Sequence, residues 1–192
     1  MYDFLCGELT HIGADGIVLA TGGVGYRLSV PATAMQRLRT RLGETVTLYT
    51  HLHVTEPALR LFGFASREER DLFLLLQTVT GVGPSLALAL LGAGPWQRLA
   101  ATIAAGEPAP LLLVKGVGRK TAQRLCLELK DKVPSVTTRL KSVLPDLVGA
   151  LTALGYGRAE ALRAAEKALE KLPGEDDLEK LLKRALQEGQ AD

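Results

Sequence analysis

Cysteine, histidine and aromatic residues are scarce in this 192-residue chain, which has only two cysteines and three histidines. Cys6 and Cys126 lie far apart and neither belongs to a CxxC pair, so no disulfide framework, zinc site or other cofactor is predicted. We expect both thiols to be buried as small apolar residues. His51 and His53 alternate on a predicted strand and share a face. They lack a carboxylate or cysteine partner at metal spacing, so we interpret them as incidental.

Long apolar runs and a strong net charge are also missing. No run approaches the roughly 18 apolar residues that span a bilayer, and the N-terminal MYDFLCGELT lacks the profile of a secretory signal. We therefore expect a soluble, cytoplasmic protein. The net charge is +2, but basic residues clearly exceed acidic ones only between residues 65 and 133, where the counts are 9 and 6. The positive excess therefore lies in the middle of the chain.

The chain contains zones of different periodicity. Residues 1–64 hold five short runs rich in Val, Leu, Tyr and Thr, and residues 31–42 have helical spacing. The predicted strands are 3–12, 16–21, 26–30, 45–54 and 58–64. Five strands with one helix favour a small barrel such as an OB-fold. From Ser66 the pattern becomes helical, with Ser66 a candidate N-cap and Glu69 in the capping-box position.

An internal repeat occupies residues 65–133, where two GVG triplets lie 35 residues apart. Each copy is predicted to be an apolar helix, a GVG turn and a second helix. Residues 134–145 are bracketed by prolines and are predicted to form a linker. Residues 146–192 hold three amphipathic segments and predict a small three-helix domain. The fold class is thus α+β and multidomain.

The glycine-rich turns match neither common nucleotide-binding motif. A Walker A loop requires GxxxxGK[ST] and a Rossmann loop requires GxGxxG, and both GVGPSL and GVGRKT fail these patterns. A glycine turn that leads into a helix has another use. The first main-chain N–H groups of a helix have no partner inside it, and the helix dipole adds positive potential there. Such a turn can therefore bind phosphate.

The two copies differ in the residues that accompany these amides. The candidate phosphate-binding residues are Gly81, Val82, Gly83 and Ser85 in the first copy, and Gly116, Val117, Gly118, Arg119, Lys120 and Arg124 in the second. Val117 is expected to point inward and anchor the turn. Lys120 and Arg124 share a helix face at i and i+4. For this charge cluster a plain solvated face is about as well supported as a phosphate site, and the first copy also fits a plain interhelical turn.

In combination these segments resemble one family. The tandem GVGPSLALALL and GVGRKTAQRLCLELKDK, preceded by GGVGYRLSVP and LRLFGF and followed by TALGY, resembles the bacterial Holliday junction branch-migration family RuvA. The resemblance covers the whole chain. It implies an OB-fold domain at 1–64, a tandem helix-hairpin-helix DNA-binding domain at 65–133, a linker at 134–145 and a UBA-like three-helix domain at 146–192.

The resemblance also implies function and partners. Family members form a flat homotetramer that holds an open Holliday junction, as one tetramer or as a pair, and recruit the motor ATPase RuvB. The junction resolvase RuvC is a further expected partner. The chain itself would be a non-catalytic DNA-binding subunit. Leu151, Leu154 and Tyr156 would lie on the RuvB-binding surface, although the same three residues also fit a helical core stripe.

Two departures from the family pattern concern charge. Relatives often have two adjacent acidic residues before the last barrel strand, which form an acidic pin at the tetramer centre. Here the loop reads Val54-Thr55-Glu56-Pro57, so Glu56 is the only carboxylate of the pin. Relatives can also carry a lysine at the position of Ser85, and its absence would weaken the first hairpin's grip.

Two rival functions stay open. A helix-hairpin-helix DNA glycosylase would need a lysine or aspartate in a pocket close behind its hairpin, and Lys130 and Asp131 are the only nearby candidates. Its pocket would also need aromatic walls, for which residues 65–133 offer only Phe73 and Trp96. A duplex-binding adaptor that tethers another repair enzyme through its helical tail is the second rival.

Overall fold

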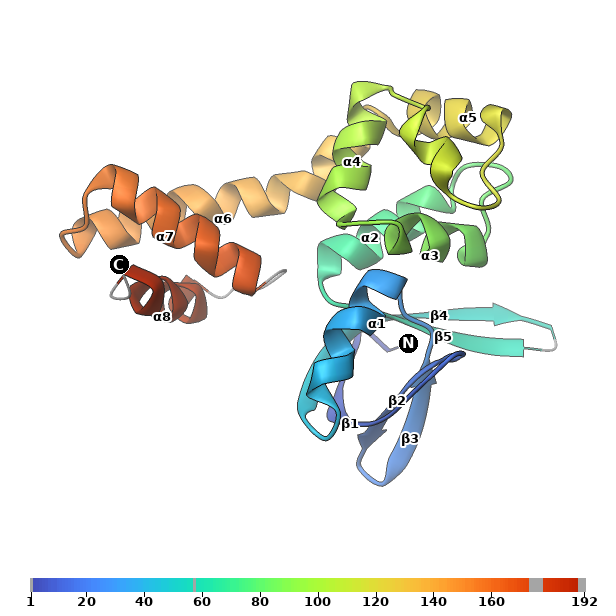
Figure 1. Ribbon diagram of the computed structural model, residues 1–192, viewed down its shortest axis with the longest axis horizontal. Coiled ribbons are helices and arrows are strands. Elements are labelled where there is room, and N and C mark those ends of the chain that lie inside the picture. Colours follow the sequence, from blue (N-terminus) through green and yellow to red (C-terminus); the bar gives the residue numbers. More distant parts are fainter. Residues whose placement is uncertain (1, 57, 173–177, 190–192) are drawn as a thin grey trace. The chain divides into compact units, whose positions relative to one another are not determined.

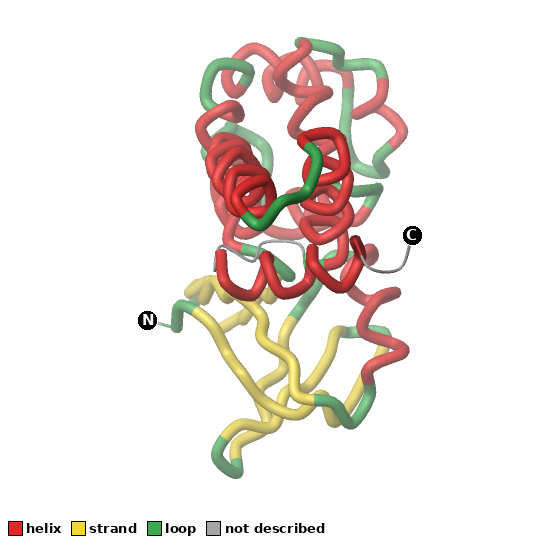
Figure 2. The backbone as a smooth tube through the Cα atoms, turned by 90° about the vertical axis from the view of Figure 1, so that its left-hand side faces the viewer, coloured by secondary structure: helices red, strands yellow, loops and turns green. Residues whose placement is uncertain are grey.

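The computed structural model describes residues 2–56, 58–172 and 178–189 of the chain. They form two compact units, residues 1–136 and 137–192. Strands occur in the first unit, and the described part of the second is helical (Figures 1 and 2).

A five-stranded antiparallel sheet begins the first unit. Its strands are β1 (Phe4–Gly13), β2 (Gly16–Thr21), β3 (Val24–Leu28), β4 (Thr45–Thr55) and β5 (Ala58–Phe64), in the spatial order β3-β2-β1-β4-β5. A single parallel bridge joins the two outer strands. The amide of Ser29 donates to Leu61 and that of Gly63 donates to Ser29, each at 2.9 Å. The sheet is thereby nearly closed into a barrel, as the predicted OB-fold requires.

Alternation along the strands fills the barrel. In β1 the buried residues Leu5, Gly7 and Leu9 alternate with exposed neighbours, and Leu19, Leu28 and Leu48 complete the core from other strands. The helix α1 (Ala32–Leu38) and the 3₁₀ turn η1 (Arg39–Arg41) follow β3, within the predicted range 31–42.

Four α-helices and a short 3₁₀ turn complete the first unit: α2 (Arg67–Leu76), α3 (Pro84–Gly92), α4 (Trp96–Ala105), η2 (Pro110–Leu113) and α5 (Arg119–Leu129). The prediction of an α-helix directly before the second GVG turn was wrong. That segment is η2, because only five residues separate Pro110 from Gly116 and leave room for one turn. The preceding helix of this copy is α4, which ends at Gly106 with φ +72°.

The predicted N-cap at Ser66 is confirmed, and Glu69 bonds back as in a capping box, although to the residue before the N-cap. The hydroxyl of Ser66 accepts from the amide of Glu69 at 3.2 Å, and the Glu69 carboxylate accepts from the amide of Ala65 at 2.9 Å. One turn later the Phe73 ring packs against Phe62 and Phe64 of β5, with centroids 5.1 and 4.7 Å away. This aromatic contact joins the helices to the barrel.

A second joint links α1 to the end of α3. The hydroxyl of Thr33 donates to the carbonyl of Leu91 at 3.3 Å, and a Cβ placed on Gly92 would lie 3.0 Å from the amide nitrogen of Ala32. The barrel and the helical region of this unit are therefore packed closely at two places.

Helices α6 (Val133–Ala153), α7 (Arg158–Lys171) and α8 (Leu178–Gly189) complete the chain. Residues 134–145, expected to form a linker, lie within α6, which contains Pro145. Gly155, at φ +97°, turns the chain between α6 and α7. The core of the second unit is small and rich in alanine, with Leu147, Leu151 and Leu181 as its largest fully buried members.

The expectation that both cysteines are buried was half wrong. Cys126 is buried but Cys6 is exposed, because β1 turns it away from the barrel core. Within the described residues no helix is both long and apolar enough to cross a membrane, and no cluster of three potential metal ligands occurs.

We predict that Glu69→Gln leaves the protein at least as stable as the native chain at pH 7. Burial of the carboxyl group raises the pKa of Glu69 above its ordinary value of 4.5. Because the neutral carboxyl group is favoured in the folded state, Glu69 contributes its full share of the folding free energy below pH 4.5. This contribution is lost as the pH rises through the folded-state pKa. The amide oxygen of glutamine can accept the same bond from Ala65 without ionising.

The measurement is the thermal unfolding midpoint at pH 4.5 and pH 7. Glu69→Gln should flatten the fall in stability between the two values. Glu69→Ala, which loses the bond, should cost about 1 kcal/mol. Equal destabilisation by both variants at pH 7 would contradict the prediction.

Candidate nucleic-acid interface

The two GVG turns have the same main-chain structure. Gly81 and Gly116 have φ of +89° and +94°. The amides of Val82 and Val117 donate, each at 3.0 Å, to carbonyls three residues earlier, those of Val79 and Val114. The 35-residue repeat seen in the sequence is therefore a repeat of backbone conformation.

Both central valines point inward, as the sequence predicted for Val117. Val82 is 4% exposed and Val117 is 8% exposed. Their amides were expected to be phosphate donors, and the structure contradicts this because each is already bonded within its own turn. The valines hold the turns, and the donors must come from the residues that follow.

The two glycines of each triplet have different reasons to be glycine. Gly81 and Gly116 need the positive φ that other residues rarely adopt. Gly83 and Gly118 have φ of −89° and −86°, which any residue can adopt. A Cβ on Gly83 or Gly118 would meet nothing within 4 Å. The fold therefore requires the first glycine of each triplet, while the second only keeps the adjacent surface clear.

Gly83 and Gly118 are the N-caps of α3 and α5, and neither helix receives a side-chain cap. The first bonds across these starts run from Ala87 to Gly83 at 3.0 Å and from Ala122 to Gly118 at 2.9 Å. We call residues 83–86 the first helix start and residues 118–121 the second helix start. Their amides precede the first intrahelical donor and suit an anion. The first start has one donor fewer because Pro84 has no N–H.

Basic side chains accompany the second helix start. Arg119 and Lys120 are exposed. Arg124 is partly engaged, since its Nη1 donates to the carbonyl of Thr80 at 3.4 Å and its Nε lies 3.8 Å from Glu128 Oε1. A shallow hollow connects Lys120 with Arg124 and is lined by Thr80, Lys120, Thr121, Gln123, Arg124 and Leu127.

Side chains near the first helix start are less charged. Ser85 is exposed and no basic residue lies between Gly81 and Gly92. The sequence survey did not single out Lys115, which is exposed and directly precedes Gly116. Its signal was its place in the repeat, where it is the counterpart of Thr80 at an offset of 35 residues.

Glu56 lies at the tip of the β4–β5 hairpin and is exposed, while Val54 and Thr55, expected in the loop, belong to β4. β1 pairs with β4 only from Thr45 to Tyr49. Beyond Thr50, β4 pairs with β5 alone, with Val54 opposite Leu59. Leu61, opposite Leu52, still belongs to the barrel, and we call the two-stranded extension beyond this pair, residues 53–56 and 58–60, the arm. It carries the Glu56 carboxylate away from the barrel.

The three residues predicted to bind a motor protein differ in their exposure. Leu151 is 0% exposed and belongs to the core of the second unit, so its assignment to a partner surface was wrong. Leu154 is 57% exposed. Tyr156 is partly buried and packs against the core. A small module has few leucines to fill its interior, and Leu151 is needed there.

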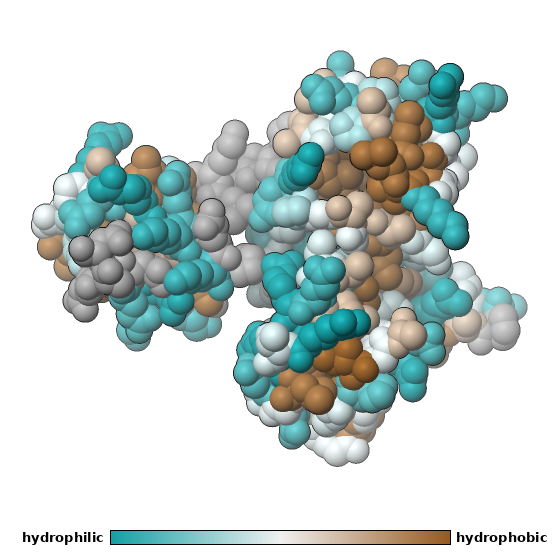
Figure 3. All heavy atoms as spheres, in the orientation of Figure 1, coloured by the Kyte–Doolittle hydropathy of each residue, from teal (hydrophilic) through white to brown (hydrophobic). Residues whose placement is uncertain are grey.

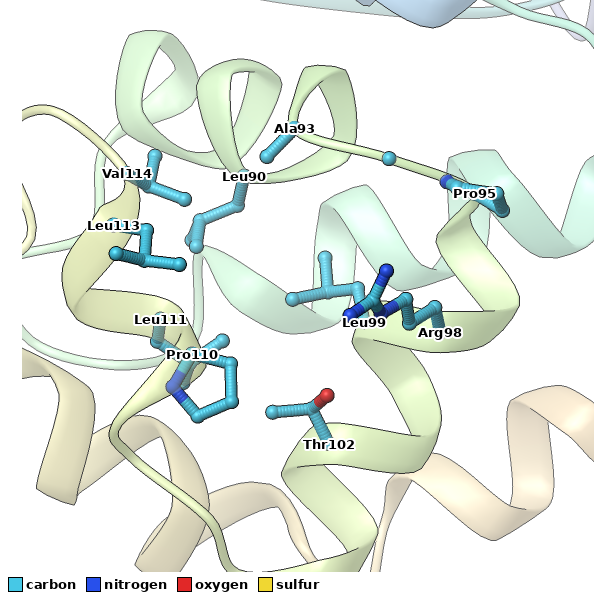
Figure 4. A pocket seen from close by; sticks show the side chains of 11 residues that line it. Leu90, Ala93, Pro95, Arg98, Leu99, Thr102, Pro110, Leu111, Leu113 and Val114 are labelled. Carbon is cyan, nitrogen blue, oxygen red and sulfur yellow. The ribbon is translucent and has the colours of Figure 1, made fainter.

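A pocket of about 280 Å³ lies behind the second hairpin, between α3, α4 and η2. Figure 4 shows aliphatic side chains, among them Leu90, Leu99 and Leu111, facing one another across it. Apolar side chains gather over the helical region on the face seen in Figure 3. Leu113, which lines the pocket, is 88% exposed. Neither Lys130 nor Asp131 lines this pocket, so it does not fit the glycosylase alternative.

Three family models match successive parts of the chain. The RuvA N terminal domain matches residues 1–63, the SAM-like helix-hairpin-helix tandem matches residues 73–131, and the RuvA C-terminal domain matches residues 142–188. Together they cover most of the sequence.

Similar proteins extend over nearly the full length. The Holliday junction branch migration complex subunit RuvA of Desulforamulus reducens is 40% identical over 198 residues, covering 98% of both chains. The protein of the same name from Symbiobacterium thermophilum is 41% identical with the same coverage. That from Chlorobaculum parvum is 40% identical over 91% of both chains.

We predict that replacing the two glycines of the second triplet by serine, one at a time, has different effects on protein stability. Gly116→Ser forces a side chain into a positive φ and should cost about 1–3 kcal/mol. Gly118→Ser places a favoured N-cap residue at the start of α5 and should leave stability unchanged or raised. Thermal unfolding of the two variants provides the measurement.

The same Gly118→Ser variant should bind DNA about tenfold more weakly or worse, because the serine hydroxyl pairs with an amide that a phosphate would otherwise accept from. Fluorescence anisotropy with a labelled DNA measures this affinity. Full affinity in a folded Gly118→Ser protein would show that the second helix start does not bind phosphate.

Proposed function

The chain belongs to the RuvA family, and from this membership we propose that it binds Holliday junction DNA and acts as the junction-holding subunit of a branch-migration complex. The binding depends on the junction's structure and not on its sequence. The chain contributes no catalytic group, and the ATPase activity of the complex resides in a RuvB partner.

The observation that carries this proposal is the pair of uncapped, glycine-led helix starts within one compact unit. Each exposes main-chain donors where the second glycine leaves room for a sugar-phosphate chain. Two equivalent starts can contact the two strands on either side of one minor groove, which a single start cannot. Contacts of this kind reach phosphates and not base edges, so all sequences are bound alike.

The arm supplies the second part of the proposed activity. In a homotetramer the four Glu56 carboxylates would meet near the crossover and repel phosphates, which helps to part the strands. With one carboxylate on each chain, this repulsion is weaker than that of a double acidic pin. The exposed position of Glu56 at the hairpin tip agrees with this role.

The second unit is the proposed contact with RuvB. Its core residues are buried, but Leu154 stands exposed immediately before Gly155, at the turn between α6 and α7. Leu154 is the most exposed large apolar side chain among the described residues of this unit, ahead of Leu162 and Leu178, and it is therefore the best candidate for an apolar contact with a partner. Leu154 therefore replaces Leu151 as the centre of the proposed surface, with Tyr156 beside it, and RuvC joins the assembly as a further partner.

We predict that changing Lys120 and Arg124 together to alanine lowers junction affinity by a similar factor for every sequence. Each lost phosphate contact reduces the slope of log affinity against log salt by about 0.9. Loss of two contacts should reduce the slope by about 1.8. If the native and variant affinities are equal at 1 M salt, the variant then binds roughly 60-fold more weakly at 0.1 M salt. Titration of labelled junctions at several salt concentrations measures both quantities.

Lys130→Ala is the matched control, because this exposed lysine follows the far end of α5, about 16 Å from the second helix start at 1.5 Å per residue. Equal affinities for the double variant and the native protein would count against the proposed interface. Linear duplex of equal length serves as competitor. Equal binding of junction and duplex would favour the tethering adaptor instead.

We predict that Leu154→Glu preserves junction binding but abolishes stimulation of the RuvB ATPase, because it puts a charge into an apolar contact. Leu178→Glu adds the same charge at another exposed leucine and should retain stimulation. ATP hydrolysis is measured with junction, RuvB and each variant. Normal stimulation by Leu154→Glu would remove Leu154 from the contact.

A further inference from the structure

Each GVG turn lies beside the second helix of the other copy. A Cβ placed on Gly116 would lie 3.3 Å from Leu86 Cδ1, in the first turn of α3. In the opposite direction, Arg124 of α5 reaches the carbonyl of Thr80, directly before Gly81. Thr80 and Lys120 also line the same hollow. The two hairpins are thus packed reciprocally, with the loop of one against the helix start of the other.

The basic residues do not follow this repeat. At an offset of 35 residues, Lys120 and Arg124 of α5 correspond to Ser85 and Ala89 of α3, neither of which is basic. The loop residues show the reverse arrangement, because Thr80 of the first copy corresponds to Lys115 of the second. Each of the two contacts between the hairpins therefore has basic residues on one side only. Where the first loop meets α5, they are on the helix. Where the second loop meets α3, the basic residue is Lys115 on the loop.

We propose that Lys115, from the loop of the second hairpin, is the cation of the first helix start and binds the same DNA phosphate as the amides of residues 83–86. This inference rests on the proposed function, since it presumes that the first helix start binds phosphate. Lys115 lies in the second copy of the repeat along the sequence, but the site it is proposed to complete is in the first copy.

The placement of Lys115 follows from the reciprocal packing. Lys115 is exposed and adjacent to Gly116, where an added Cβ would meet the side chain of Leu86 from the first helix start. In the equivalent contact, Thr80 lies with Lys120 of the second helix start along one hollow. Applied to the other contact, the same arrangement puts Lys115, the counterpart of Thr80, on the side of Ser85, the counterpart of Lys120. Its four-carbon stem allows the ammonium group to reach an anion held there.

The charge contributed by Lys115 offsets the weakness of the first helix start, which has one amide fewer because of Pro84 and only a neutral Ser85 beside it. With Lys115 included, both helix starts combine main-chain donors with at least one flexible cation. Each can then hold a phosphate in a salt-dependent, sequence-independent manner.

The first test is the junction affinity of Lys115→Ala in the full-length protein. Loss of one phosphate contact should reduce the salt slope by about 0.9 and the affinity at 0.1 M salt by about eightfold. Lys130→Ala removes the same charge from the same unit and should change both quantities little. If Lys115→Ala and Lys130→Ala behave alike, the inference is overturned.

The second test asks whether Lys115 acts at the first helix start. Adding Ser85→Lys to Lys115→Ala moves the charge to the α3 side of the same contact, at the position where the second copy has Lys120. Affinity and salt slope should return to near native values. Gln97→Lys, at an exposed position of α4, restores the net charge elsewhere and should not rescue binding.

These variants separate the inference from the proposed function. Equal rescue by Ser85→Lys and Gln97→Lys would overturn the assignment of Lys115 to the first helix start, while the DNA-binding role would stand. If the native protein binds junction no better than linear duplex, the proposed function itself fails, whatever Lys115 does.

Discussion

An α-helix cannot pair the first main-chain N–H groups of its own first turn, and the way this chain meets that constraint differs between its helices. At α2, where the helical region joins the barrel, the Ser66 hydroxyl accepts from the first-turn amide of Glu69, and the Glu69 carboxylate bonds back to the amide of Ala65 just before the helix. At α3 and α5 the N-cap is glycine and no side chain takes that role. The main-chain donors at α2 are thus bonded by nearby side chains, while those at the starts of α3 and α5 have no side-chain cap.

The valines make this arrangement possible. Val82 and Val117 fill the interior of their hairpins and use their own amides to close the turn. The chain therefore enters each helix in a fixed direction before any ligand arrives. A site whose donors are fixed in advance loses little conformational entropy on binding.

The sequence predicted the features that depend on local pattern. The five strands, the N-cap at Ser66 and the 35-residue repeat all follow from periodicity and from residue types with few alternatives. The exposed and buried roles of Leu151 and Leu154 were not separable, because both lie on one amphipathic pattern and only packing against α7 and α8 selects between them. Reciprocal packing of the hairpins, with Arg124 on Thr80, joins residues 44 positions apart and has no sequence signal.

The site was likewise predictable only in part. The glycines at positive φ and the basic residues after the second turn could be read from the repeat. Two further features could not be predicted from the sequence. The second glycine of each triplet could carry a Cβ without a clash, and the valine amides already donate within their turns. Both follow from dihedral angles and hydrogen bonds, which the residue types do not specify.

The barrel rim is closed at one point, through Ser29, and this affects which edges another strand could reach. β3 pairs with β2, and among the described residues the bridge toward β5 lies at Ser29, so main-chain groups along β3 stay open on that side. The arm is open in the same way, because β4 beyond Thr50 has a partner on one side only. Strand addition by another molecule can therefore use these two edges and not the paired middle of the sheet.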